Sequence, residues 1–277
     1  VDGQSGIEDP VGMTGIRLEV EAQIIAGSIN TIKNLAKCAN QADLEINELI
    51  FSPLATSKAL LSKKQKEMGV ALIDIGAGTT ELIVFEEGKL KHCAVLPVGS
   101  INITNDIAIG LRTSLDVAEK VKLKYASATQ EKIRESEKID LSDFDPNEEN
   151  KVAKKYVAEI VQARLSEIFS MIRNELKKTG SDGMLPAGIV FTGGGAKLNN
   201  LIDFTKEQLR LPAQIGYPLS EVSGIVDKLD DPSYTTSVGL MLWGIENNKN
   251  KTQSSLNLKQ FNSVIDKAKQ IFKQFIP

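Results

Sequence analysis

The fold of this chain follows most directly from residues 74–82, which are Asp74-Ile75-Gly76-Ala77-Gly78-Thr79-Thr80-Glu81-Leu82. An apolar run at residues 70–73 precedes them, and a second strand-like run at residues 82–85 follows. Because glycine permits φ > 0 and carries no Cβ, the backbone N–H groups of this loop can approach an anion closely. The threonine hydroxyls add donors, and Asp74 is placed to hold a water bound to a metal ion. The stretch therefore predicts a hairpin that binds phosphate.

A plainer interpretation stays open, namely a hairpin whose tight turn needs glycine, beside a surface aspartate. Two common nucleotide-binding folds do not fit the sequence. A P-loop needs Gly-Lys-Ser/Thr at the start of a helix, and a dinucleotide fold needs a helix directly after its glycines. Here a strand follows the loop, and a turn at Glu87-Gly88 leads to a third apolar run at residues 93–98. This order predicts a three-stranded meander.

The composition sets broad limits on structure and partners. A chain of 277 residues can form one or two domains with a full core. Its net charge of −3 provides no basic field, so no nucleic-acid partner is expected. Cys38 and Cys93 lack the spacing of metal ligands and are expected to be reduced core residues. No apolar run is long enough to predict a membrane-spanning helix.

Periodicity predicts the remaining elements. Alternating residues predict a half-buried strand at 17–25, and a helical stripe predicts a helix from Ser28 or Asn30 to about Ala42. In chain order, the other predictions are a strand at 46–51, a helix from Pro53 through Lys66, helices at 104–111 and 115–126, an exposed excursion with a short strand or two at 130–150, a helix at 151–178, a strand at 187–192, a helix through about Arg210, a strand at 213–216 and a helix at about 234–245.

Two further motifs could contact a nucleotide. Gly193-Gly194-Gly195 lies between a buried strand and a predicted helix, where glycines allow close backbone approach and a helix N-terminus offers free N–H donors. Glu119 and Lys122 are three residues apart and therefore share one helix face. For this pair, a solvated surface ion pair stays open as the alternative.

The order of strand, hairpin, strand and helices resembles the superfamily of actin, the sugar kinases and the heat-shock chaperone ATPases. Particular stretches are similar to the FtsA family of actin-like bacterial division proteins. These stretches are residues 1–4, 9–19, 69–80, 96–99, 103–108, 190–196 and 237–240. The similarity runs along nearly the whole chain except for residues 127–150 and 246–257.

The resemblance implies an α/β, actin-like (ribonuclease-H-like) fold of two lobes, with a partial first lobe and a complete second lobe. Residues 1–68 would be the end of the first lobe with the FtsA-type extra subdomain. Residues 69–245 would be the second lobe, with a small subdomain at about 100–180. Because the chain begins at Val1 in turn-rich sequence, it is expected to be an N-terminally truncated fragment without the first phosphate loop.

The resemblance also implies ATP and Mg²⁺ between the lobes. The second phosphate loop would supply Asp74, Gly76, Gly78, Thr79 and Thr80, with Asp74 holding Mg²⁺ through water. Gly193, Gly194 and Gly195 would form the adenosine loop, while Glu119 and Lys122 would reach the adenine and ribose. No general base is identified, so at most weak ATP hydrolysis is expected.

The C-terminal residues carry a separate signal. After a polar linker at 246–257, residues 258–277 place apolar side chains on one helix face and four lysines against one aspartate on the other. This pattern predicts an amphipathic helix in an anionic membrane surface; the alternative is a helix docked on its own domain. The residues predicted to meet the membrane are Phe261, Ile265, Lys267, Lys269, Ile271, Phe272, Lys273, Phe275 and Ile276.

For function, the resemblance implies an adaptor at the cytoplasmic face of the bacterial cell membrane, peripheral and at the division septum. It would assemble into actin-like filaments, bind the C-terminal peptide of the tubulin-like protein FtsZ through residues of about 100–180, and recruit later division proteins. The alternatives are a pilus-assembly scaffold ATPase related to FtsA and, on the same fold, a sugar or metabolite kinase.

Overall fold

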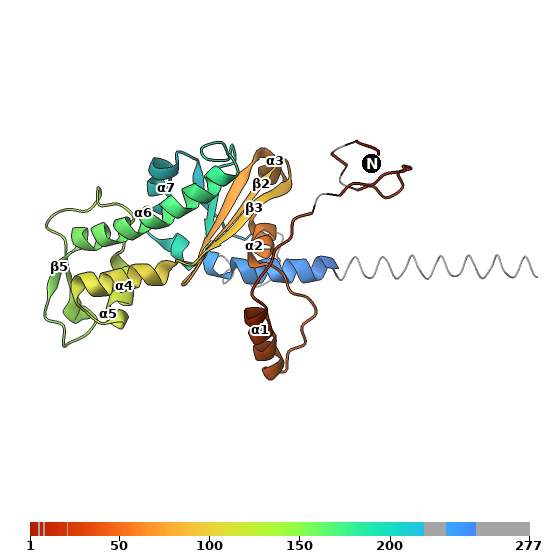
Figure 1. The fold of residues 1–277 in the computed structure, drawn as a ribbon. Coiled ribbons are helices and arrows are strands. Elements are labelled where there is room, and N and C mark those ends of the chain that lie inside the picture. Colours follow the sequence, from red (N-terminus) through yellow and green to blue (C-terminus); the bar gives the residue numbers. More distant parts are fainter. Residues whose placement is uncertain (5, 8, 21, 219–230, 248–277) are drawn as a thin grey trace, which may run out of the picture. The chain divides into compact units, whose positions relative to one another are not determined.

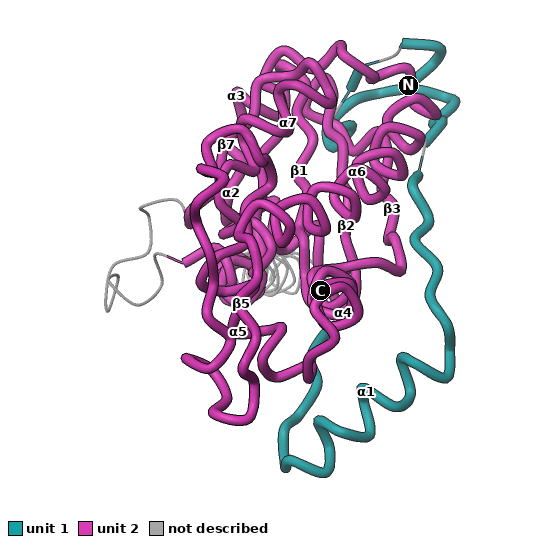
Figure 2. The backbone as a smooth tube through the Cα atoms, turned by 90° about the vertical axis from the view of Figure 1, so that its left-hand side faces the viewer, with its two compact units in different colours: residues 1–49 teal, residues 50–277 magenta. Residues whose placement is uncertain are grey.

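The computed structural model describes residues 1–247 apart from 5, 8, 21 and 219–230. The chain divides into two compact units, residues 1–49 and 50–277 (Figure 2). The linker beyond residue 247 and the tail at 258–277 lie outside the described residues, so the predicted amphipathic helix is not part of the structure below. Among the helices described, none has the length and apolar character needed to cross a membrane.

The first unit contains one helix, α1 (Ile29–Gln41), at the predicted place, with Ser28 at the N-cap position. The strands predicted at 17–25 and 46–51 are wrong: the described residues of both segments have no regular secondary structure. A strand needs a hydrogen-bonded neighbour, and no strand lies among the described residues of this unit. Cys38 is exposed, so the prediction that it is a core residue is also wrong, whereas Cys93 is half-buried and packs against a core cluster of the second unit.

The second unit is organised around a five-stranded sheet in the order β3-β2-β1-β6-β7 (Figure 1). The predicted meander is confirmed as β1 (Val70–Ile75), β2 (Thr80–Glu86) and β3 (Lys89–Leu96), which pair antiparallel. On the other side of β1, β6 (Ile189–Thr192) and β7 (Ala213–Ile215) run parallel to it. The central position of β1 explains its nearly unbroken apolar run, because both of its faces are buried.

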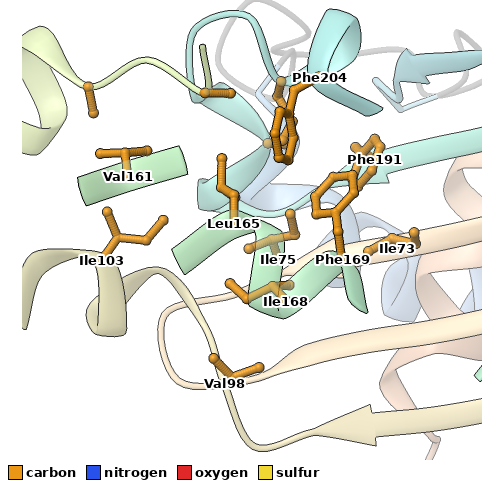
Figure 3. Packing of buried hydrophobic residues seen from close by; sticks show 14 of the residues in the cluster. Ile73, Ile75, Val98, Ile103, Val161, Leu165, Ile168, Phe169, Phe191 and Phe204 are labelled. Atoms are coloured by element: carbon orange, nitrogen blue, oxygen red, sulfur yellow. The ribbon is translucent and has the colours of Figure 1, made fainter. Parts of the chain in front are cut away.

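Helices cover both faces of this sheet. Alternate β1 residues, Ala71, Ile73 and Ile75, join the larger core cluster with α6 (Lys154–Lys178) and α7 (Leu201–Leu209), where Phe169, Phe191 and Phe204 pack together (Figure 3). The intervening residues Val70 and Leu72 pack against Leu60 and Leu61 on the opposite face. The period-two alternation of a strand therefore builds two separate cores.

The helix predicted from Pro53 through Lys66 is two helices, α2 (Ser52–Leu60) and α3 (Lys63–Met68). The break follows from Ser62, whose side chain accepts from the Gln65 backbone N–H while the Gln65 side chain accepts from the Ser62 N–H. This capping box starts a new helix, because it satisfies donors that a continuous helix would have used internally.

A helical insertion separates the meander from β6. It contains α4 (Ser100–Leu111), α5 (Leu115–Tyr125), β4 (Lys138–Asp140), the 3₁₀ turn η1 (Leu141–Asp143), β5 (Lys151–Ala153) and the long α6. The helix predicted at 151–178 starts three residues later, because residues 151–153 pair with β4. The predicted excursion with short strands is confirmed, although Ile139 and Leu141 bury their side chains in the core.

After β6, the predicted single helix through Arg210 is wrong. A 3₁₀ turn, η2 (Gly194–Lys197), comes first, and α7 begins only after Asn200, which has φ of 61°. A 3₁₀ turn, η4 (Pro232–Tyr234), leads into a helix at 235–247, close to the predicted 234–245. Gly239 of this helix lies against α2: a Cβ there would come within 2.0 Å of the Ala55 carbonyl oxygen.

Candidate nucleotide site

The two glycine loops, far apart in sequence, meet at the carboxyl ends of β1 and β6. These strands are parallel, with Asp74 opposite Thr192, so the residues after them leave the sheet at the same edge. Gly193 has φ of 81°, and a Cβ there would come within 2.2 Å of Asp74 Oδ1 and 2.6 Å of the Ile75 carbonyl oxygen. Only glycine fits this close approach. The edge of an open sheet at such strand ends is where α/β proteins commonly bind ligands.

Asp74 is half-buried and lies beside a second carboxylate, Glu81, and both features disfavour its charged form. Burial raises the pKa of Asp74 to about 6, and the charge of Glu81 adds to this, while a hydrogen bond from Thr236 opposes it. Glu81 lies directly opposite Asp74 in the β1–β2 register and accepts a hydrogen bond of 2.7 Å from the Ser52 hydroxyl. Thr236 donates to Asp74 Oδ2 at 3.3 Å and bonds Thr56 at 2.9 Å. The two neighbouring carboxylates would be stabilised by a bound cation.

The loop between β1 and β2 is held by its carbonyl groups. Gly76 N donates to the Thr79 carbonyl oxygen, and the first turn of α4 donates back to the loop, from Ser100 N to Gly76 O at 2.9 Å and from Ile101 N to Ala77 O at 2.8 Å. In contrast, the backbone N–H groups of Ala77, Gly78 and Thr79 donate to no acceptor among the described residues. Three consecutive free N–H groups at an exposed loop form a cradle of donors that could bind an anion.

The predicted loop residues have different environments. Thr79 is exposed, whereas Thr80 is fully buried and donates its hydroxyl to the Val98 carbonyl oxygen at 2.8 Å. Thr80 therefore links the loop to the segment before α4. Gly76 and Gly78 do not have positive φ, so the conformational reason given for them above is wrong. A Cβ on Gly78 would meet no atom within 4 Å, which leaves open space over the loop.

Glu119 and Lys122 lie on α5 and contact the first turn of α4. Lys122 donates to the Ser100 carbonyl oxygen at 3.2 Å and to Thr104 Oγ1 at 2.8 Å, and it pairs with Glu119 at 2.7 Å. Burial raises the pKa of Glu119, but hydrogen bonds from Lys122 and Thr104 outweigh it and the pKa is lowered. The alternative of a solvated surface ion pair is wrong for Lys122, whose side chain is only 11% exposed.

The remaining glycines lie beside the same strand ends. Gly194 is exposed, and Gly195 approaches β1 so closely that a Cβ would come within 2.4 Å of Ile75 Cγ2. The Thr192 hydroxyl is buried and bonds Thr235 at 2.8 Å, which ties the loop to the start of the helix at 235–247. The predicted α-helix is replaced by the single 3₁₀ turn η2, but the backbone N–H groups of Gly194 and Gly195 still donate to no acceptor among the described residues.

Comparison with known proteins identifies the family. The family model described as "Cell division protein FtsA" matches residues 71–239, and the model of the SHS2 domain inserted in FtsA matches residues 1–26. The chain belongs to the FtsA family. FtsA of Pseudomonas aeruginosa is 34% identical over 268 residues, which are 97% of this chain and 64% of that protein. The chain thus spans less than two thirds of this relative.

Solved structures agree on an actin-like fold. MreB5 of Spiroplasma citri bound to AMPPNP superimposes with a TM-score of 0.66 at 19% identity, over 82% of this chain and 68% of the other. A PilM–PilN type IV pilus biogenesis complex contains a chain that superimposes with a TM-score of 0.61 at 20% identity, over 77% of this chain and 57% of the other. At these identities the likeness establishes the fold alone.

Three residues of this FtsA-family site escaped the sequence analysis: Glu81, Ser52 and Thr236. Glu81 could have been placed, because a hairpin centred on a four-residue loop, 76–79, pairs Ile75 with Thr80 and Asp74 with Glu81. Ser52 and Thr236 come from the start of α2 and from the helix at 235–247, and no local pattern marks them. The described residues contain no cluster of three or more His, Cys, Asp or Glu. Mg²⁺ held by one or two carboxylates would keep several waters.

Replacing Asp74 tests the raised pKa. The folded carboxyl has a pKa of about 6 against the usual 3.8, so its ionisation opposes folding. The contribution of Asp74 to the free energy of unfolding should therefore be fully present below pH 4 and be lost as the pH rises through about 6. Asp74→Asn removes this loss and should stabilise the protein by roughly 1–3 kcal/mol at pH 8, with little effect at pH 4.

Chemical denaturation at both pH values measures this effect. Asp203→Asn is the matched control, because a hydrogen bond from Lys132 lowers the pKa of that exposed carboxyl. This control should give no stabilisation at pH 8. Equal stabilities of the wild type and Asp74→Asn at pH 8 would contradict the electrostatic account of the site.

Proposed function

We propose that this chain is the nucleotide-binding and membrane-tethering part of an actin-like division protein. It binds ATP with Mg²⁺, assembles into filaments, and tethers the FtsZ ring to the cytoplasmic face of the cell membrane at the septum, where later division proteins join. The observation that carries the nucleotide part is the cradle of three free N–H groups at Ala77, Gly78 and Thr79, beside Asp74 and Gly193.

The chemistry of this edge suits a nucleotide di- or triphosphate. Free backbone N–H groups bind phosphate oxygens, and Asp74 with Glu81 supplies the oxygen ligands that Mg²⁺ prefers, directly or through water. When bound, the metal would neutralise phosphate charge. Gly193 and Gly195 let their loop pack closely against β1, and the exposed Gly194 leaves open space at this strand end, where the adenosine part could lie. The neighbour MreB5, which was solved with AMPPNP, supports the assignment by fold.

Membership of the FtsA family supports the division role over the alternatives. A pilus biogenesis protein shares the fold at 20% identity, whereas FtsA relatives reach 37% identity over 98% of the chain. The membrane part of the proposal rests on residues 258–277, which lie outside the described residues. Their sequence places Phe261, Phe272 and Phe275 among lysines, a composition that favours anionic lipid surfaces.

One weak membrane helix per chain is sufficient in a filament. Many tails presented by one polymer bind the same surface, so the overall affinity exceeds that of a single tail by orders of magnitude. By family resemblance, the FtsZ C-terminal peptide would bind the insertion at about 100–180, which contains α4, α5 and α6.

Gly78→Val tests the nucleotide proposal. A side chain at Gly78 projects into open space, so the fold and melting temperature should be retained while the phosphate cradle is covered. Isothermal titration with ATP and Mg²⁺ should show affinity at least about tenfold weaker than that of the wild type. Gly244→Val is the matched control, because a Cβ there also meets no atom within 4 Å. Equal ATP affinities for Gly78→Val and the wild type would contradict the proposal.

Liposome co-sedimentation tests the tether. Deleting residues 258–277 should abolish pelleting with anionic vesicles and with it the recruitment of FtsZ to those vesicles. Phe272→Asp should weaken pelleting much more than Gln270→Asp, which adds the same charge at a residue outside the predicted apolar face. Equal pelleting of the deleted and complete chains would exclude the tail as the anchor.

A further inference from the structure

Lys122 has no hydrogen-bond donor left for a ligand. A lysine ammonium carries three N–H groups, and here they face three partners: the Ser100 carbonyl oxygen, Thr104 Oγ1 and the Glu119 carboxylate. The Lys122 side chain is 11% exposed, whereas that of Glu119 is 40% exposed. Of the two residues expected to reach adenosine, only Glu119 presents substantial surface to solvent.

The bond from Lys122 helps to hold one peptide group in the first turn of α4, whose Ser100 carbonyl oxygen also accepts from the Thr104 hydroxyl at 3.4 Å. A trans peptide is planar, and its C=O and N–H point in opposite directions. The carbonyl of the Ser100–Ile101 peptide accepts from the Lys122 ammonium at 3.2 Å, and the N–H of the same peptide donates to the Ala77 carbonyl oxygen at 2.8 Å. A charged donor on the carbonyl also strengthens the hydrogen bond made by the N–H of that peptide group.

A second peptide group continues this chain of contacts into the phosphate loop. The Ala77 carbonyl belongs to the Ala77–Gly78 peptide, so holding its oxygen against α4 directs the Gly78 N–H away from α4. In the same way, the bond from Ser100 N to Gly76 O directs the Ala77 N–H away from α4. Both N–H groups belong to the free donors of the cradle. Two peptide groups in series therefore connect the Lys122 ammonium to the Gly78 N–H.

We propose that Lys122 is a positioning residue for the phosphate loop, acting through the Ser100–Ile101 and Ala77–Gly78 peptide groups to aim the cradle N–H groups at the nucleotide phosphates. The proposal rests on the nucleotide function above and assigns Lys122 a different role from direct contact with ribose or base. Glu119 and Thr104 hold the ammonium in place. The Lys122 ammonium therefore affects the binding of the phosphates and not the binding of adenosine.

A ligand series separates positioning from direct contact. Lys122→Met keeps the apolar stem and removes the ammonium, so affinity for ADP and ATP should fall about tenfold while affinity for adenosine changes less than about twofold. Lys120→Met is the matched control on the same helix, since among the described residues the exposed Lys120 ammonium donates only to the Phe144 carbonyl oxygen. It should leave all three affinities unchanged. An equal loss for adenosine, ADP and ATP, or no loss for any, would overturn the proposal.

A ligand-free measurement keeps this test independent of the proposed function. In the 277-residue chain without nucleotide, the ¹⁵N and ¹H amide signals of Ile101 and Gly78 should shift in Lys122→Met and return toward the wild-type positions in Lys122→Arg. Unchanged Ile101 and Gly78 signals would overturn the proposal that Lys122 acts through these two peptide groups. If the wild type binds none of the three ligands, the nucleotide function fails. The amide shifts still decide whether Lys122 orients the Gly78 N–H through the two peptide groups. Lys122→Gln serves as the neutral variant if Lys122→Met does not fold.

Discussion

The site depends on the hydrogen bonds from the first turn of α4 to the carbonyl oxygens of Gly76 and Ala77. A helix N-terminus has unused N–H donors, and here two of them are consumed by the loop. Because each peptide group is planar, binding its carbonyl on one side leaves its N–H on the other. The arrangement of α4 therefore directs the N–H groups of Ala77 and Gly78 away from α4, and Gly78 leaves the space over the loop open.

The close approach of β1 and β6 adds the second requirement. Gly193 fits against Asp74 only because it lacks a Cβ, and the resulting edge holds a carboxylate whose pKa is raised to about 6. Such a group costs stability, and a bound cation would offset this cost.

Much of this arrangement follows from sequence, and the failures have physical reasons. The meander and its loop were predictable because the apolar runs, the glycines between them and Asp74 are local features of the sequence. The register then places Glu81 opposite Asp74. The strands predicted at 17–25 and 46–51 failed, because alternation alone provides no hydrogen-bonded neighbour. The contacts of Ser52, Thr236 and Lys122 come from helices distant in sequence, so no local pattern could reveal them.

The central claim is that the free N–H groups of Ala77, Gly78 and Thr79 bind the nucleotide phosphates. A crystal structure of the chain with ADP and Mg²⁺ tests it most directly. The account predicts phosphate oxygens at about 3 Å from these three nitrogen atoms, with the hydrogen bonds from α4 to Gly76 and Ala77 retained. Bound ADP whose phosphates lie away from all three nitrogens would contradict it.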